Sequence, residues 1–99
     1  MKLGIDIQEI RQFRHLKRFF TQTELDYIAQ KNNSLQTVAG LFAAKEAYFK
    51  ALGTGITHNT LKTIEILHNE RGAPFIRENV LLSITHTKQV AAAVCIVLD

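Results

Sequence analysis

The chain has 99 residues, of which 46% are hydrophobic and 21% charged, as expected for one soluble globular domain spanning residues 1–99. Its net charge of +3 indicates an anionic partner, such as nucleic acid, a phosphorylated metabolite or an acidic protein. The single cysteine, Cys95, excludes a disulfide framework and a cysteine-rich zinc site.

Asp6 and Glu9 interrupt the N-terminal segment "MKLGIDIQEI", so it lacks the apolar centre of a signal peptide. No apolar stretch approaches the length of a membrane span. Cys95 lies in the apolar run "VAAAVCIVLD", which predicts a buried strand residue. We therefore expect a cytoplasmic protein without a membrane partner.

The N-terminal third predicts a strand followed by a basic helix. "KLGIDI" is rich in isoleucine and leucine and reads as a strand that Asp6 interrupts. From Glu9 to Phe20 the period becomes helical. At about 100° per residue the arginines of this segment share the face opposite its phenylalanines. That basic face is either simply solvated or a docking surface for an acidic partner: Arg11, Arg14 and Arg18.

Two more helices are predicted downstream. Thr21 and Glu24 have the spacing of a capping box, which starts a helix running to about residue 30. Ser34 is expected to cap a third helix that ends near residue 52, where Gly53 suits the C-terminal stop.

The second half predicts strands. "KTIEILHN" alternates, "NERGAP" reads as a turn, and "NVLLSITHT" and "VAAAVCIVLD" read as strands joined in a hairpin through residues 87–89. One strand, then helices, then strands indicates an α+β fold with an antiparallel sheet.

Charges interrupt the apolar stripe of the third helix. Glu46 and Lys50 are spaced i,i+4, which fits an ordinary helix ion pair or a functional site at the edge of the core. Lys45 falls within the stripe, where it either snorkels to solvent or pairs with Asp6. The helix runs into "GTG", where backbone N–H groups could approach an anion.

Asp6 is a carboxylate inside an apolar strand, which is costly to bury unless it is paired or binds a metal. If the strand packs beside the third helix, Asp6 meets Glu46, and two carboxylates suit a hard cation such as Mg²⁺. The hydroxyls and imidazole of "SITHT" could contact phosphate oxygens, although a lone histidine such as His86 is more often structural.

Four segments occur in an order that resembles the holo-[acyl-carrier-protein] synthases, which are 4'-phosphopantetheinyl transferases. These are "GID" at 4–6, "FAAKEAYFKALGTG" at 42–55, "GAP" at 72–74 and "SITHT" at 83–87. The resemblance covers nearly the whole chain, and the second segment is its most specific part. It implies transfer of the phosphopantetheine arm of coenzyme A to a serine of apo acyl carrier protein, in fatty acid biosynthesis.

The resemblance also implies roles for single residues. Asp6 and Glu46 resemble the Mg²⁺ ligands, and Lys50 resembles the lysine that contacts the transferred phosphate. The positions expected to bind coenzyme A are Lys50, Gly53, Thr54, Gly55, Pro74, Ser83, His86 and Thr87. The family implies a homotrimer whose sites combine GxD and KEA from one subunit with SITHT from its neighbour. The basic helix matches the region that meets the acidic recognition helix of the carrier. Glu46 or a water on the metal would accept the serine proton.

The chain departs from the family at two positions. Leu41 stands where members commonly have an arginine, so either another basic residue such as Lys45 compensates or coenzyme A binds less tightly. Gln8 stands where larger relatives often carry a second acid, which implies that water completes the metal shell. The alternatives are a non-catalytic scaffold that binds carrier protein and a small module that binds phosphate or nucleic acid. We expect no nucleic-acid partner, since a recognised DNA-binding pattern is missing.

Overall fold

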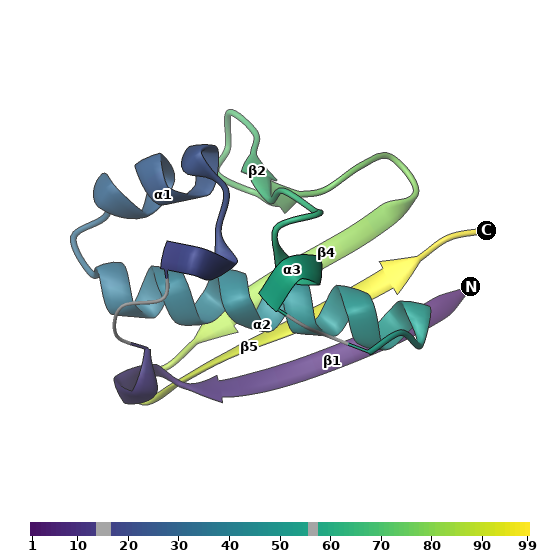
Figure 1. Ribbon diagram of the computed structural model, residues 1–99, viewed down its shortest axis with the longest axis horizontal. Coiled ribbons are helices and arrows are strands. Elements are labelled where there is room, and N and C mark those ends of the chain that lie inside the picture. Colours follow the sequence, from purple (N-terminus) through teal and green to yellow (C-terminus); the bar gives the residue numbers. More distant parts are fainter. Residues whose placement is uncertain (14–16, 56–57) are drawn as a thin grey trace.

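A three-stranded antiparallel sheet forms one layer of the fold and a long helix covers one of its faces (Figure 1). The structure, a computed structural model, describes residues 1–13, 17–55 and 58–99. The strand order is β1 (Lys2–Glu9), β5 (Val90–Val97) and β4 (Val80–His86), so β5 is central. A separate hairpin pairs β2 (Leu67–His68) with β3 (Pro74–Phe75).

The helix on the sheet is α2 (Ser34–Leu52), which packs over β1 and β5. The shorter α1 (Gln22–Ala29) packs against α2, and α3 (His58–Leu61) is a single turn. This arrangement confirms the predicted α+β class with an antiparallel sheet. Over the described residues, no helix combines the length and the apolar character needed to cross a membrane.

Helix α2 lies directly against β1 because Gly4 has no side chain. A Cβ atom at Gly4 would lie 1.9 Å from the carbonyl oxygen of Ala47 and 2.7 Å from the backbone nitrogen of Ala51. Only glycine permits this approach. Asp6 follows Gly4 by two positions and therefore faces the helix as well.

The two faces of the sheet differ in burial. Small side chains of β5 face α2, and Ala91, Ala93 and Cys95 are all nearly inaccessible, which confirms the buried position predicted for Cys95. The opposite face is open and apolar. Its large side chains have exposed fractions between 53% and 66%: Leu3, Ile5, Ile7 and Leu81.

Three predicted boundaries are wrong. Strand β1 continues to Glu9, and the described part of the segment predicted as a basic helix forms two 3₁₀ turns, η1 (Ile10–Gln12) and η2 (Lys17–Phe19). Arg14 lies outside the described residues. The N-cap of α2 is Asn33, whose side chain accepts a bond from the backbone N–H of Gln36. In "KTIEILHN" only residues 67–68 pair as a strand.

Candidate active site

The Asp6 carboxylate is held by two donors where β1 meets α2. Its side chain is only 7% exposed. The Lys50 ammonium donates to Oδ1 at 2.9 Å and the Gln8 amide nitrogen donates to Oδ2 at 2.6 Å. The hydrogen bond that Lys50 donates to Asp6 raises the pKa of Lys50, so the ammonium stays charged. Lys50 also donates to the carbonyl of Ile5 at 3.3 Å.

Glu46 completes a group of two carboxylates and one ammonium. It is half-buried, and its pKa is raised by burial and by the neighbouring charge of Asp6. The predicted Glu46–Lys50 helix ion pair is not among the salt bridges of the described residues, where Lys50 pairs with Asp6 instead. The structure thus brings together the strand carboxylate and the two flanking charges of α2.

Lys45 has a structural role. Its side chain is completely buried and its ammonium lies 2.6 Å from Glu24 of α1. The same ammonium donates to the backbone carbonyls of Phe19, Leu61 and Ile64. The predictions that Lys45 snorkels, or pairs with Asp6, are therefore wrong, and a buried Lys45 cannot compensate for Leu41.

The "GTG" segment ends α2. Gly53 adopts the left-handed conformation with φ of 74°, which favours glycine. The N–H groups of Gly53 and Thr54 donate to carbonyls of Lys50 and Phe49 in the last turn of the helix. These two donors are therefore not available to an anion, and the roles of Gly53, Thr54 and Gly55 in coenzyme A binding stay predictions.

A second group of predicted residues lies at the β4 edge of the sheet. Pro74 and His86 line a pocket of about 290 Å³, together with Leu41 and with aromatic and small residues of α1, α2 and the β2–β3 hairpin. Among the residues that the structure describes, no lysine or arginine lines this pocket, and Leu41 is buried there. Ser83 alternates with Ile84 and His86 along β4 and so faces the opposite side of the sheet.

Thr87 lies in the β4–β5 turn, beside this pocket. Its hydroxyl oxygen accepts bonds from the backbone N–H groups of Gln89 and Val90, both at 3.1 Å. Its own hydroxyl proton is therefore free to point away from the turn. The turn confirms the hairpin predicted through residues 87–89.

The two groups lie apart within one chain. Asp6 and Ile84 both align with Ala93 of β5, but from opposite neighbouring strands. On α2, Gly40 and Leu41 lie on the flank opposite Glu46 and Lys50, at about 100° per residue. The carboxylate group and the pocket with His86 thus occupy opposite edges of the sheet.

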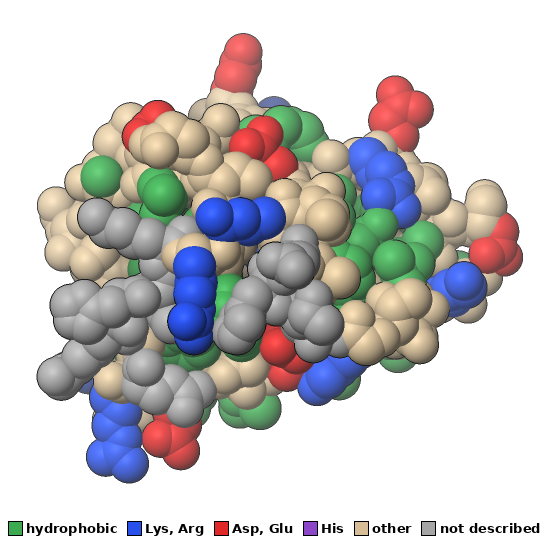
Figure 2. Space-filling model, viewed as in Figure 1, with side chains coloured by type: hydrophobic (Ala, Val, Ile, Leu, Met, Phe, Trp, Pro, Cys, Tyr) green, Lys and Arg blue, Asp and Glu red, His purple; other side chains and the backbone are tan. Residues whose placement is uncertain are grey.

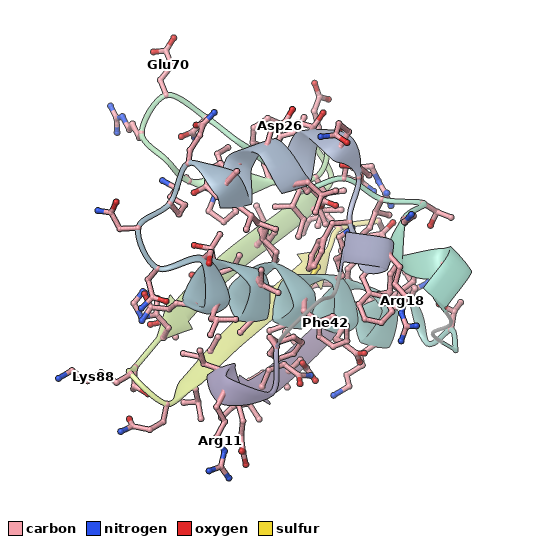
Figure 3. All side chains as sticks on the ribbon, turned by 60° about the vertical axis from the view of Figure 1, so that its left-hand side comes forward. Arg11, Arg18, Asp26, Phe42, Glu70 and Lys88 are labelled. Atoms are coloured by element: carbon pink, nitrogen blue, oxygen red, sulfur yellow. The ribbon has the colours of Figure 1, made fainter. Side chains whose placement is uncertain are left out.

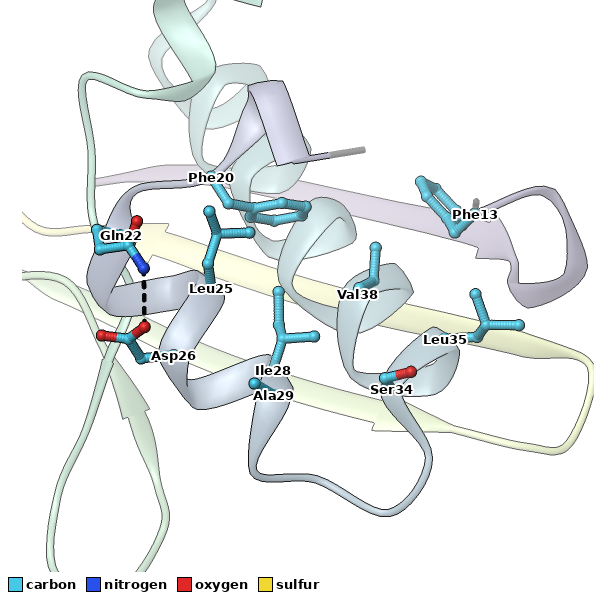
Figure 4. Close-up of a pocket in the computed structure, with 10 residues that line it drawn as sticks. All are labelled: Phe13, Phe20, Gln22, Leu25, Asp26, Ile28, Ala29, Ser34, Leu35 and Val38. Atoms are coloured by element: carbon cyan, nitrogen blue, oxygen red, sulfur yellow. Dashed lines mark hydrogen bonds between the residues drawn. The ribbon is translucent and has the colours of Figure 1, made fainter. Parts of the chain in front are cut away.

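A pocket of about 540 Å³ lies between α1 and α2 (Figure 4). Its walls are mainly apolar, with Phe20, Leu25, Ile28 and Val38 pointing inward. None of the residues predicted for metal or coenzyme A binding lines it. This pocket is therefore separate from the carboxylate group.

Sequence reasoning missed two contributors to these sites. Gln8 was considered only as the replacement of an acid, although its two-residue spacing places it on the same strand face as Asp6, where the two side chains bond. Glu24 was identified as a capping-box residue, which the structure confirms, but its second role as the partner of Lys45 carried no local signal. The contact between Lys45 and Glu24 depends on which elements pack together, whereas Gln8 and Asp6 lie two positions apart in β1.

The α+β frame and its group of carboxylates with a lysine define a class of protein suited to phosphoryl-group transfer. Comparison with known proteins agrees: the sequence pattern of the 4'-phosphopantetheinyl transferase superfamily matches residues 2–95. The chain belongs to this superfamily, which confirms the resemblance found in its motifs.

Within the superfamily, the chain is similar to holo-[acyl-carrier-protein] synthases. A holo-[acyl-carrier-protein] synthase of Caldicellulosiruptor saccharolyticus is 42% identical over 115 residues, covering 95% of this chain and 93% of the relative. The crystal structure of such a synthase from Bacillus anthracis, in complex with CoA (3',5'-ADP), has a TM-score of 0.86 at 34% identity and covers 97% of this chain and 94% of its own. The Helicobacter pylori enzyme in complex with coenzyme A has a TM-score of 0.84 at 29% identity, with coverages of 96% and 98%.

Proposed function

We propose that this chain transfers 4'-phosphopantetheine from coenzyme A to a serine of an apo acyl carrier protein, with Mg²⁺ as cofactor. The observation that carries the proposal is the group formed by Asp6, Glu46 and Lys50 where β1 meets α2. Its relatives are synthases of this kind, and two of their structures contain coenzyme A or its 3',5'-ADP part.

The residues fit a Mg²⁺ ion. Asp6 is nearly buried, and the two carboxylates are close enough for Asp6 to raise the pKa of Glu46, a repulsion that a divalent cation would relieve. Within residues 1–13, 17–55 and 58–99 no three acidic, histidine or cysteine side chains converge on one point. Two carboxylates are nevertheless a usual protein contribution for Mg²⁺, whose remaining ligands are waters and substrate phosphates.

When bound, Mg²⁺ would neutralise charge on the pyrophosphate of coenzyme A. Lys50 supplies a second positive charge, since its side chain is 52% exposed and its ammonium retains donors beyond the bond to Asp6. Glu46 accepts the proton of the attacking serine while the serine oxygen bonds to the phosphorus that carries pantetheine, the pyrophosphate P–O bond breaks and adenosine 3',5'-bisphosphate leaves. A carboxylate held beside the reacting phosphate is a suitable general base for this step.

A homotrimer joins the two separated groups. One chain carries the carboxylates at the β1 edge and His86 at the β4 edge, so a neighbouring subunit can complete each site. The open sheet face supports self-association, because four large apolar side chains are left in solvent there: Leu3, Ile5, Ile7 and Leu81. The reaction belongs in the cytoplasm, in keeping with a free buried thiol at Cys95.

The carrier protein docks through arginines near the end of β1 and before α1. Arg11 and Arg18 are exposed and point outward from two separate 3₁₀ turns (Figure 3). Lys and Arg side chains are spread among other groups on the face in Figure 2. Arg11 and Arg18 carry the charge opposite to that of the acidic helix of a carrier.

The test is to mix the chain with coenzyme A, Mg²⁺ and apo carrier protein, and to look for the added phosphopantetheine mass. We expect the mass shift with the unsubstituted chain and its loss in Asp6→Ala and Glu46→Ala, with circular dichroism showing an intact fold. Glu70→Ala, an exposed acid on the hairpin turn, is the matched control.

Each other outcome contradicts part of the proposal. Transfer by either carboxylate variant at the normal rate would refute the metal assignment. Carrier binding without a mass shift would identify a non-catalytic scaffold. Leu41, which stands in the pocket where relatives commonly have an arginine, would then explain the loss of coenzyme A binding. If the chain neither binds the carrier protein nor transfers phosphopantetheine, the remaining hypothesis is a module that binds phosphate or nucleic acid.

A further inference from the structure

Gln8 holds the Asp6 carboxylate through a neutral side chain. Gly4, Asp6 and Gln8 alternate on the face of β1 that packs on α2, while the intervening residues face outward. The Gln8 amide nitrogen lies 2.6 Å from Oδ2 of Asp6, and the Lys50 ammonium lies 2.9 Å from Oδ1. The carboxylate is therefore held from the strand and from the helix at once.

These two hydrogen bonds fix the orientation of the Asp6 carboxylate. An ionised carboxylate only accepts hydrogen bonds, so the amide must turn its NH₂ group toward Asp6. Among the described residues, Gln8 and Lys50 each donate to a different oxygen, so rotation of the Asp6 side chain would break at least one bond. The ammonium of Lys50 is half-exposed at the end of a flexible chain, whereas Gln8 is half-buried and belongs to the same strand as Asp6.

We propose that Gln8 is a positioning residue, which orients Asp6 for the divalent cation and keeps it oriented when Lys50 turns to substrate phosphate. The inference rests on the proposed function. Its physical basis is that hydrogen-bond partners of a metal-binding carboxylate fix its orientation, and their loss typically weakens metal binding. A neutral amide does this without adding a third negative charge beside Asp6 and Glu46.

The test is Gln8→Met, which keeps the length of the side chain and removes the donor. Mn²⁺ binding, measured by the electron paramagnetic resonance signal of the free ion with coenzyme A present, should weaken by about tenfold or more. The Mg²⁺ concentration for half-maximal transfer should rise in proportion, while the KM for carrier protein stays unchanged. Gln8→Asn keeps an amide but is too short to reach Oδ2, so it should show the same loss.

The matched control is Gln22→Met on α1. Gln22 also donates its amide to an aspartate, at 2.8 Å from Oδ1 of Asp26, but on an exposed helix face away from the carboxylate group. This variant should bind Mn²⁺ like the unsubstituted chain. The control separates loss of an amide–carboxylate bond in general from loss of the bond at Asp6.

The outcomes distinguish the inference from the proposed function. If Gln8→Met and Gln8→Asn fold and bind Mn²⁺ as tightly as the unsubstituted chain, the positioning role is wrong and the transfer reaction still stands. If the unsubstituted chain neither binds Mn²⁺ nor transfers phosphopantetheine, both proposals fall. A higher KM for carrier protein, together with unchanged Mn²⁺ binding, would also overturn the inference.

Discussion

At the scale of single residues, two lysines of one helix have opposite roles. Lys45→Met would leave Glu24 buried without its counter-charge, and we expect unfolding to become easier by about 3–5 kcal/mol. Lys50→Met should cost at most about 1 kcal/mol, because that side chain is 52% exposed and Gln8 still donates to Asp6. Transfer by Lys50→Met should nevertheless fall by about a hundredfold or more.

Urea unfolding and the transfer assay measure both effects, and each lysine variant is the control for the other. If the Lys45→Met variant is as stable as the unsubstituted chain, the buried ion pair between Lys45 and Glu24 does not stabilise the fold. A Lys50→Met variant with normal transfer would remove Lys50 from the site. The catalytic role of Lys50 stays a prediction, and the structural role of Lys45 was not predicted, because the helical pattern says nothing about Glu24 lying opposite.

At the scale of elements, the contact between β1 and α2 depends on Gly4. In Gly4→Ala the added Cβ would lie 1.9 Å from the carbonyl oxygen of Ala47, so the strand must move away from the helix. Overpacking of this kind typically costs about 1–3 kcal/mol. The shift should also separate Asp6 from Lys50 and lower transfer.

Thermal unfolding measures the loss, with Gly55→Ala as the control for stability because a Cβ there meets nothing within 4 Å. Equal stability of the two variants would show that β1 does not need this close approach. The glycine of "GID" therefore has a physical reason: it lets the helix come near enough for Glu46 and Lys50 to reach the carboxylate.

Element types were predicted better where the signal is local. The capping box at Thr21 and the stop at Gly53 are both confirmed, since each involves groups within one helical turn. The helix expected from Glu9 to Phe20 is wrong over its described residues. There β1 continues to Glu9 by pairing with Val90, a contact with the far end of the chain that no local period reveals.

At the scale of the whole molecule, the division of the site between two edges of the sheet could not be derived from the residues. The motifs gave the members of each group, but their separation follows from the strand order β1, β5, β4. The open apolar face also emerges only when Leu81 is placed beyond Ile96 and opposite Leu3 across the central strand. Register is a tertiary property, since a slip by one residue would exchange the two faces.

If each active site takes Asp6 from one subunit and His86 from its neighbour, two inactive variants should restore activity to each other, which a site within one subunit would not allow. Asp6→Ala and His86→Ala should each be inactive alone, yet trimers formed by co-expression should contain interfaces that receive Asp6 from one variant and His86 from the other. In randomly mixed rings roughly a quarter of the interfaces combine both unsubstituted halves, so about that fraction of transfer activity should return. Steady-state transfer by the co-purified mixture measures it, and light scattering checks that the mass is that of a trimer. A mixture as inactive as its components would show that the two edges do not meet between subunits. Full activity of His86→Ala alone would remove the β4 edge from the site.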